Sequence, residues 1–195
     1  GCELLDCGAS RVFAIADHQV AHIYLNDRAL LPAVRALLEA TEGVARVLEG
    51  DGLRSEGLDH ARSGDLVAVS TEDAWFTYYY WDDEAKAPDF ARCVDIHRKY
   101  GYDPVELFVD PTLMLAKLRI AGKLLRKALG FRVLMNVISL DPSLVKGSHG
   151  ALPRDERDWP VLIGTGDLQT GAHLPATEVH ARLLQACLHP AGPAS

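Results

Sequence analysis

The chain has 195 residues, 48% of them hydrophobic and 24% charged, which is the composition of a globular domain with a core. Its formal net charge of −7 argues against binding along a nucleic-acid backbone, which requires a basic surface. No apolar run approaches the roughly 20 residues that span a bilayer, so we expect neither a nucleic-acid polymer nor a membrane as partner.

The four cysteines form no CxxC pair and show no spacing typical of a disulfide framework. Because disulfides are rare in reducing compartments, this pattern predicts a cytoplasmic protein. The chain begins with Gly1 rather than Met, and we therefore expect it to be a piece of a longer protein.

Residues 10–70 are predicted to form a small subdomain with a helix on one face of a sheet. Short apolar runs predict its strands, and apolar residues with a period near 3.6 predict its helix. We interpret the order as a β-α-β-β unit and assign the chain to the α/β class. The predicted strands cover 12–16, 20–25, 44–48 and 66–70, and the predicted helix covers 29–40.

Beyond residue 70, the densest aromatic stretch is 75–81, which suits a strand covered on both faces, with a base-stacking wall as the alternative. Residues 112–129 predict an amphipathic helix whose five basic residues are most simply a solvated face. Further strands are predicted at 133–140 and 161–164, and a last helix at 176–188. The tail at 191–195 contains only Ala, Gly, Pro and Ser, and we expect it to be disordered.

The strongest candidate for chemistry is His149, in the loop Gly147-Ser148-His149-Gly150. Small neighbours let the imidazole reach a metal ion while the backbone bends closely past it. Pro153, an apolar run and the predicted last helix follow this loop.

This order resembles the end of the alkaline phosphatase superfamily core, in its type I phosphodiesterase and nucleotide pyrophosphatase branch. The segments 17–25, 64–69 and 95–104 are similar to segments of bacterial members of that family. The resemblance extends over residues 1–190, and it implies the C-terminal portion of such a domain with a partial alkaline-phosphatase-like core. It also implies that His149 is the last protein ligand of a two-zinc site, with Gly147 and Gly150 as its backbone hinges.

Three further residues are weaker metal-ligand candidates. Asp17 and His18 resemble the Asp-His pair of the superfamily, but Gln19 follows where the family has Gly, so a strand-entry turn or a pocket edge is the alternative. His97 competes with His149 for the role of final ligand, because it precedes a sequence similar to the family's last histidine motif. Beside it, Arg98 and Lys99 could hold a phosphate, with a solvated loop as the alternative.

The resemblance implies a metal-dependent hydrolase that cleaves a small phosphoester, with two Zn²⁺ ions and a Thr or Ser nucleophile. No nucleophile loop precedes the first predicted strand, so we expect the nucleophile in a missing N-terminal half, which would be a partner of this chain. This chain alone is then expected to bind zinc poorly and to be inactive. The alternatives are a non-catalytic α/β module that binds a small ligand or another protein, and a degenerate phosphoesterase.

Overall fold

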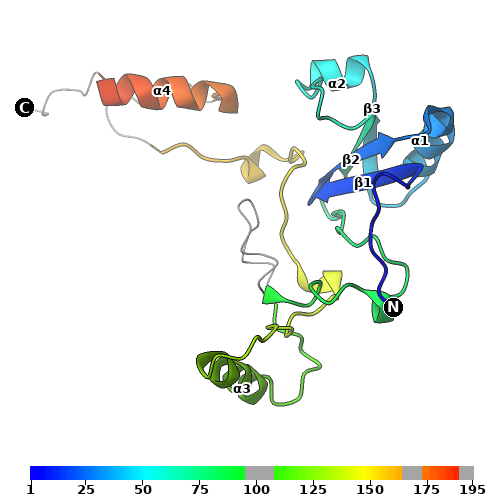
Figure 1. Ribbon diagram of the computed structural model, residues 1–195. Coiled ribbons are helices and arrows are strands. Elements are labelled where there is room, and N and C mark those ends of the chain that lie inside the picture. Colours follow the sequence, from blue (N-terminus) through cyan, green and yellow to red (C-terminus); the bar gives the residue numbers. More distant parts are fainter. Residues whose placement is uncertain (95–107, 164–172, 189–195) are drawn as a thin grey trace, which may run out of the picture. The chain divides into compact units, whose positions relative to one another are not determined.

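The computed structural model describes residues 1–94, 108–163 and 173–188. The chain divides into two compact units, Gly1–Leu152 and Pro153–Ser195, each of which is described here by itself. Figure 1 shows the elements in chain order. His97, Arg98, Lys99 and the tail at 191–195 lie outside the described residues.

A four-stranded antiparallel sheet forms the centre of the first unit, with the strand order β1-β2-β4-β3. Figure 1 labels three of its strands, β1, β2 and β3. All five residues of β4 are buried, as expected for an apolar, β-branched run between two neighbouring strands. The chain therefore contains helices and a sheet, as predicted. The four strands are β1 (Val12–Asp17), β2 (Val20–Leu25), β3 (Val44–Leu48) and β4 (Leu66–Ser70).

The predicted β-α-β-β order is wrong by one strand, because β1 and β2 are separate strands of one hairpin. The observed order up to Ser70 is β-β-α-β-β, with a short helix, α2 (Asp51–Ser55), between the last two strands.

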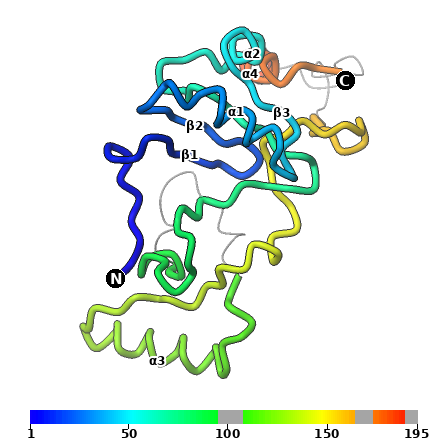
Figure 2. The backbone as a smooth tube through the Cα atoms, turned by 90° about the vertical axis from the view of Figure 1, so that its right-hand side faces the viewer, coloured from blue at the N-terminus to red at the C-terminus, as the bar shows by residue number. Residues whose placement is uncertain are grey.

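Helix α1 (Leu31–Glu39) confirms the predicted helix, and a 3₁₀ turn capped by Asp27 precedes it. Its apolar residues pack on the core of β2 and β4, and Figure 2 shows α1 beside the strands.

The aromatic stretch 75–81 is not a strand, which corrects the prediction. Its rings pack on one another instead of alternating across a ladder, with Tyr79 and Trp81 stacked at 4.7 Å between centroids. Trp81 is buried with Ala91 and Leu140 in a second, smaller core. The predicted strand at 133–140 is also wrong, because only isolated bridges form there, at Asn136 and Ile138.

Helix α3 (Ala116–Ala128) begins four residues later than predicted. Asp110 closes a turn before it by accepting hydrogen bonds from the backbone N–H and the hydroxyl of Thr112. Leu115 then adopts a left-handed φ of 53°, which a helix interior excludes.

In the second unit, α4 (Ala176–Leu188) confirms the predicted last helix. The predicted strand at 161–164 is wrong for the described residues 161–163, where Val161 is 80% and Ile163 89% exposed. A strand needs a hydrogen-bonded neighbour, and none of the described residues pairs with this segment. Within the described residues, no helix has the combined length and apolar content needed to cross a bilayer.

Candidate metal site

The candidate site begins at the tight turn between β1 and β2. Asp17 is the last residue of β1 and pairs with Val20, so His18 and Gln19 form a two-residue hairpin loop. His18 has a φ of 54°, in the left-handed region. Two-residue hairpins favour this region in the loop and usually fill it with Gly, Asn or Asp. A histidine there is strained, and such strain clusters at functional sites.

The second part of the site is the loop that carries His149, far along the sequence but in the same compact unit. The backbone N–H of Gln19 donates to the carbonyl oxygen of His149 at 3.0 Å. Gly150 has a φ of +115°, and a Cβ there would lie 3.2 Å from Cγ2 of Val20. Gly150 is thus required for the close approach, whereas Gly147 has open space and no such φ.

These two segments bring Asp17, His18 and His149 together. One potential ligand atom from each residue lies within 4.8 Å of the others. The rings of His18 and His149 have centroids 4.2 Å apart and planes inclined by 37°. Asp17 and His149 are exposed and His18 is half-buried, so an ion could reach the group from solvent.

Ser148 orients one of the two imidazoles. Its Oγ lies 2.8 Å from Nδ1 of His18, within hydrogen-bond distance. Histidine ligands of metals commonly use one ring nitrogen for the ion and the other for such a partner, which fixes the ring. The arrangement of Ser148 and His18 therefore has the form expected beside a metal ligand.

The side chain of Gln19 connects the hairpin turn to the loop that carries His149. Only 6% of the residue is exposed, and its amide nitrogen donates to the carbonyl oxygens of Thr71, Glu72 and Ala74 at 3.2–3.3 Å. Its amide oxygen accepts from the backbone N–H of Ala151 at 3.2 Å. Gln19 is thus the buried link between the site's two segments.

An aromatic hollow adjoins the site. The backbone N–H of Phe76 donates to the carbonyl oxygen of His18 at 2.7 Å, and the Trp75 ring lies 6.0 Å from that of His18 between centroids. Trp75 also lines the hollow, together with Tyr78, Tyr79 and residues of the segment 138–145.

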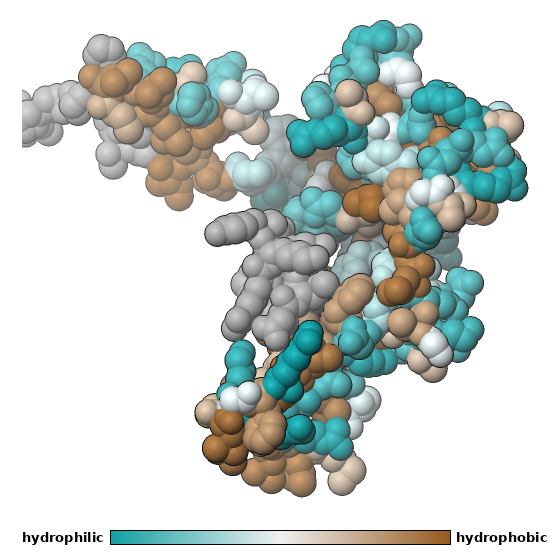
Figure 3. Space-filling view, viewed as in Figure 1, coloured by the Kyte–Doolittle hydropathy of each residue, from teal (hydrophilic) through white to brown (hydrophobic). Residues whose placement is uncertain are grey.

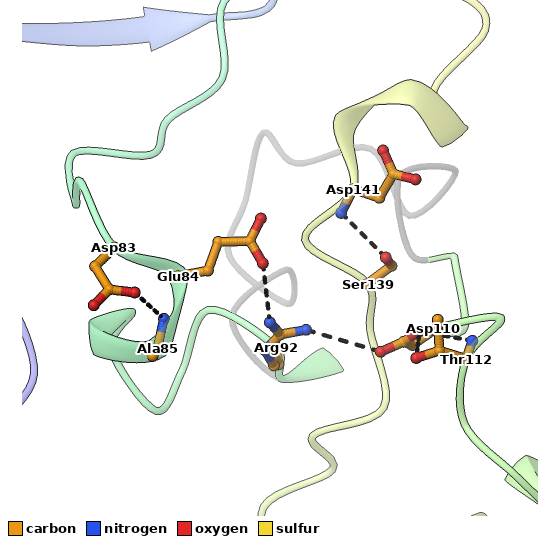
Figure 4. A network of polar contacts seen from close by, with 8 residues as sticks. All are labelled: Asp83, Glu84, Ala85, Arg92, Asp110, Thr112, Ser139 and Asp141. Carbon is orange, nitrogen blue, oxygen red and sulfur yellow. Dashed lines mark hydrogen bonds and ion pairs between the residues drawn. The ribbon is translucent and has the colours of Figure 1, made fainter.

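A separate polar network centres on Arg92 (Figure 4). Its guanidinium lies 3.5 Å from the Glu84 carboxylate and 3.8 Å from that of Asp110. Hydrogen bonds from Thr112, together with the charge of Arg92, lower the pKa of Asp110 below its usual value. All of its charged groups have partners within the network, so we interpret the network as structural.

No protein-family model matches the chain, and no curated protein or solved structure is similar enough to count as a match. The resemblance to phosphodiesterases therefore stays a prediction. The evidence for the site is therefore its geometry. Asp17, His18 and His149 are the predicted candidates that the described structure brings together.

The roles of Gln19 and Ser148 are not predicted by the sequence. The only feature of the sequence that indicates a role for Gln19 is its place as a polar residue between a turn and an apolar strand. Nothing in the sequence indicates that Ser148 contacts His18, because that contact depends on how the loop returns to the hairpin.

Proposed function

We propose that the chain binds a divalent metal ion, best Zn²⁺, through Asp17, His18 and His149, and that this centre serves the hydrolysis of a phosphoester. The observation that carries the proposal is the convergence of these three side chains from two distant segments to within 4.8 Å.

The donor set fits zinc. Zn²⁺ binds imidazole nitrogen and carboxylate oxygen at about 2.0–2.2 Å, so the donor atoms around one tetrahedral ion lie roughly 3.3–3.6 Å apart. The three candidate ligand atoms lie within 4.8 Å of one another, so the exposed side chains of Asp17 and His149 would rotate inward to complete this geometry. Three protein ligands with one position left for water or substrate is the usual composition of a catalytic zinc site.

The proposed reaction class has two supports. A bound Zn²⁺ supplies a Lewis acid that polarises a phosphoryl oxygen. Among the chain's own residues, Ser148 would hold the His18 ring, and Trp75, whose ring centroid lies 6.0 Å from that of His18, would border the bound substrate. The second support is the sequence resemblance, which places the nucleophile and the ligands of a second zinc ion in an N-terminal half. Within the described residues, no second group of this kind is found.

Zinc binding tests the metal part of the proposal. Exposed thiols can compete for zinc, so Cys2, Cys7 and Cys187, which are all exposed, are first replaced by Ser. The sequence alone predicts weak zinc binding by this chain, but the grouping of three potential ligands leads us to expect one zinc ion per chain in a titration against a chromophoric chelator. His149→Ala should weaken this binding by about tenfold or more. The matched control His180→Ala, exposed on α4, should leave it unchanged. Absence of binding, or equal binding by both variants, contradicts the site.

The reaction class is tested separately with bis(p-nitrophenyl) phosphate. The zinc-loaded chain alone should not turn this substrate over, whereas the chain joined to its N-terminal half should. A joined protein that binds zinc at His149 but hydrolyses no phosphoester would retain the metal site and exclude the proposed reaction.

A second candidate rests on the contact of 2.8 Å between Ser148 Oγ and His18 Nδ1, which is also the distance of a nucleophile from its general base. In that case Ser148 would be labelled by a fluorophosphonate probe in the presence of a chelator. If Ser148 only orients His18, the probe should not react, and Ser148→Ala should lower zinc affinity.

A further inference from the structure

The segment 111–140 differs in charge from the rest of the chain. It contains six Lys and Arg residues and no Asp or Glu, although the whole chain has a net charge of −7. Charge separated in this way commonly marks a surface for an anionic partner. Five of these cations lie in α3, and the sixth, Arg132, follows the helix. The five are Lys117, Arg119, Lys123, Arg126 and Lys127.

Helix α3 does not bury its apolar face. Leu118, Leu125 and Leu129 are spaced by seven and four residues and so share one stripe, yet they are 66%, 62% and 67% exposed. Its inner side is formed instead by Ile120 and Lys123, which are half-buried. Figure 3 shows apolar and hydrophilic side chains gathered together over the helix, at the bottom of the view.

A polar contact fixes this orientation. The ammonium group of Lys123 donates to the carbonyl oxygen of Leu134 at 2.9 Å and to the side-chain oxygen of Asn136 at 2.5 Å. Because Lys123 is held against Leu134 and Asn136, the leucine stripe on the opposite side of the helix faces away from these two residues. The prediction that the basic residues form the solvated face is therefore incomplete, since the apolar stripe is solvated too.

Cations flank the stripe on both sides. At 100° per residue, Arg119 and Arg126 lie on one side of Leu118 and Lys117 lies on the other. A helix with an apolar stripe between Lys and Arg residues is the usual form of one that lies in a membrane interface. Met114 and Leu115 extend the exposed apolar surface before the helix, and Phe131 extends it after.

We propose that α3 docks on an anionic lipid surface, with Leu118, Leu125 and Leu129 in the headgroup boundary and the flanking cations on lipid phosphates and carboxylates. This proposal departs from the expectation, drawn from the lack of a membrane-spanning run, that no membrane is a partner of the chain. Charge complementarity selects this occupant, because the acidic remainder of the chain would be repelled and only the basic segment could approach. The proposal is independent of the metal site.

Co-sedimentation with vesicles tests the docking. The full chain should bind vesicles of phosphatidylcholine with about 30% phosphatidylserine about tenfold more tightly than vesicles of phosphatidylcholine alone, and salt should weaken the binding. The double variant Leu118→Gln/Leu125→Gln should lose about tenfold, as should Arg119→Gln/Arg126→Gln. All four side chains are exposed, so near-ultraviolet circular dichroism should show an unchanged fold.

The matched controls are Leu37→Gln, a leucine 67% exposed on α1, and Arg62→Gln, an exposed arginine outside the segment. Both should bind as the unchanged chain does. The proposal is overturned by no vesicle binding, by equal binding to both lipid compositions, or by equal losses in the controls. It is also overturned if the leucine variants abolish self-association or capture of an acidic protein while lipid binding is absent.

Discussion

The ring of His149 lies against the ring of His18, with centroids 4.2 Å apart. The backbone favours this contact, because the N–H of Gln19, the residue after His18, donates to the carbonyl oxygen of His149 at 3.0 Å. The hairpin turn and the distant loop are therefore joined by main-chain and side-chain hydrogen bonds. The candidate ligands are pre-positioned, which reduces the ordering required when a metal ion binds.

Gln19 is the residue on which this junction depends most. Replacing it by Leu removes three donor contacts and one acceptor contact from a buried position. We expect the free energy of unfolding to fall by about 2 kcal/mol, because carbonyl groups of the 71–74 loop lose their partner. Urea denaturation measures this loss, and zinc affinity should fall with it. The control Gln185→Leu, exposed on α4, should change neither quantity.

Because His18 has a left-handed backbone, we expect a substitution there to change zinc affinity much more than the free energy of unfolding. Asn adopts a left-handed φ more readily than His, so His18→Asn should change the free energy of unfolding by less than about 1 kcal/mol. The same change removes a candidate ligand, so zinc affinity should fall strongly. In β2, His22 accepts from the backbone N–H of Gly64 at 3.1 Å. His22→Asn should therefore lower stability and leave zinc binding intact, and the reverse pattern would contradict the assignment.

The sequence predicted those elements that have a local signal. Helices α1 and α4 follow from apolar residues at helical spacing, and the buried strand β4 follows from a continuous apolar run. The strand predicted at 75–81 is wrong because aromatic residues favour strands, whereas here Tyr79 and Trp81 stack on each other and no strand among the described residues pairs with this stretch. The start of α3 was misread because the turn at Asp110 competes with helix formation.

The candidate site could be predicted only in part. The sequence indicated His149 through its glycine-flanked loop and gave Asp17 and His18 as weaker candidates. That these three meet could not be read from spacing, because it depends on the tertiary hydrogen bond between Gln19 and His149. Gln19 itself looked like a departure from a motif, and only its burial shows why the turn needs it.

The glycines of the His149 loop allow a matched comparison. Gly150 has a φ of +115° and would bring a Cβ to within 3.2 Å of Val20, whereas Gly147 has open space around it. Gly150→Ala should lower the free energy of unfolding by about 1–2 kcal/mol and weaken zinc binding by displacing His149. Gly147→Ala should leave both near their original values. Thermal denaturation and chelator competition measure the two effects, and equal behaviour of the variants would mean that the bend at Gly150 does not position His149.

Asp110 predicts part of the acid sensitivity of the first unit. The Thr112 hydroxyl and backbone N–H, followed by the charge of Arg92, hold the pKa of Asp110 below its unfolded value of about 3.9. As pH falls, the unfolded chain therefore takes up this proton first. The stabilisation is complete above about pH 4 and is lost as pH falls through the lower folded pKa.

Asp110→Asn removes this dependence, so its free energy of unfolding should decline less steeply below about pH 4 than that of the unchanged chain. Thr112→Val removes the hydroxyl donor and keeps the backbone N–H, and it should give an intermediate slope. Other carboxylates with a lowered pKa, such as Asp27 and Asp141, are present in all three proteins, so the differences isolate Asp110. Urea denaturation at a series of pH values measures the slopes. Identical slopes would show that the contacts drawn in Figure 4 do not stabilise the ionised carboxylate in solution.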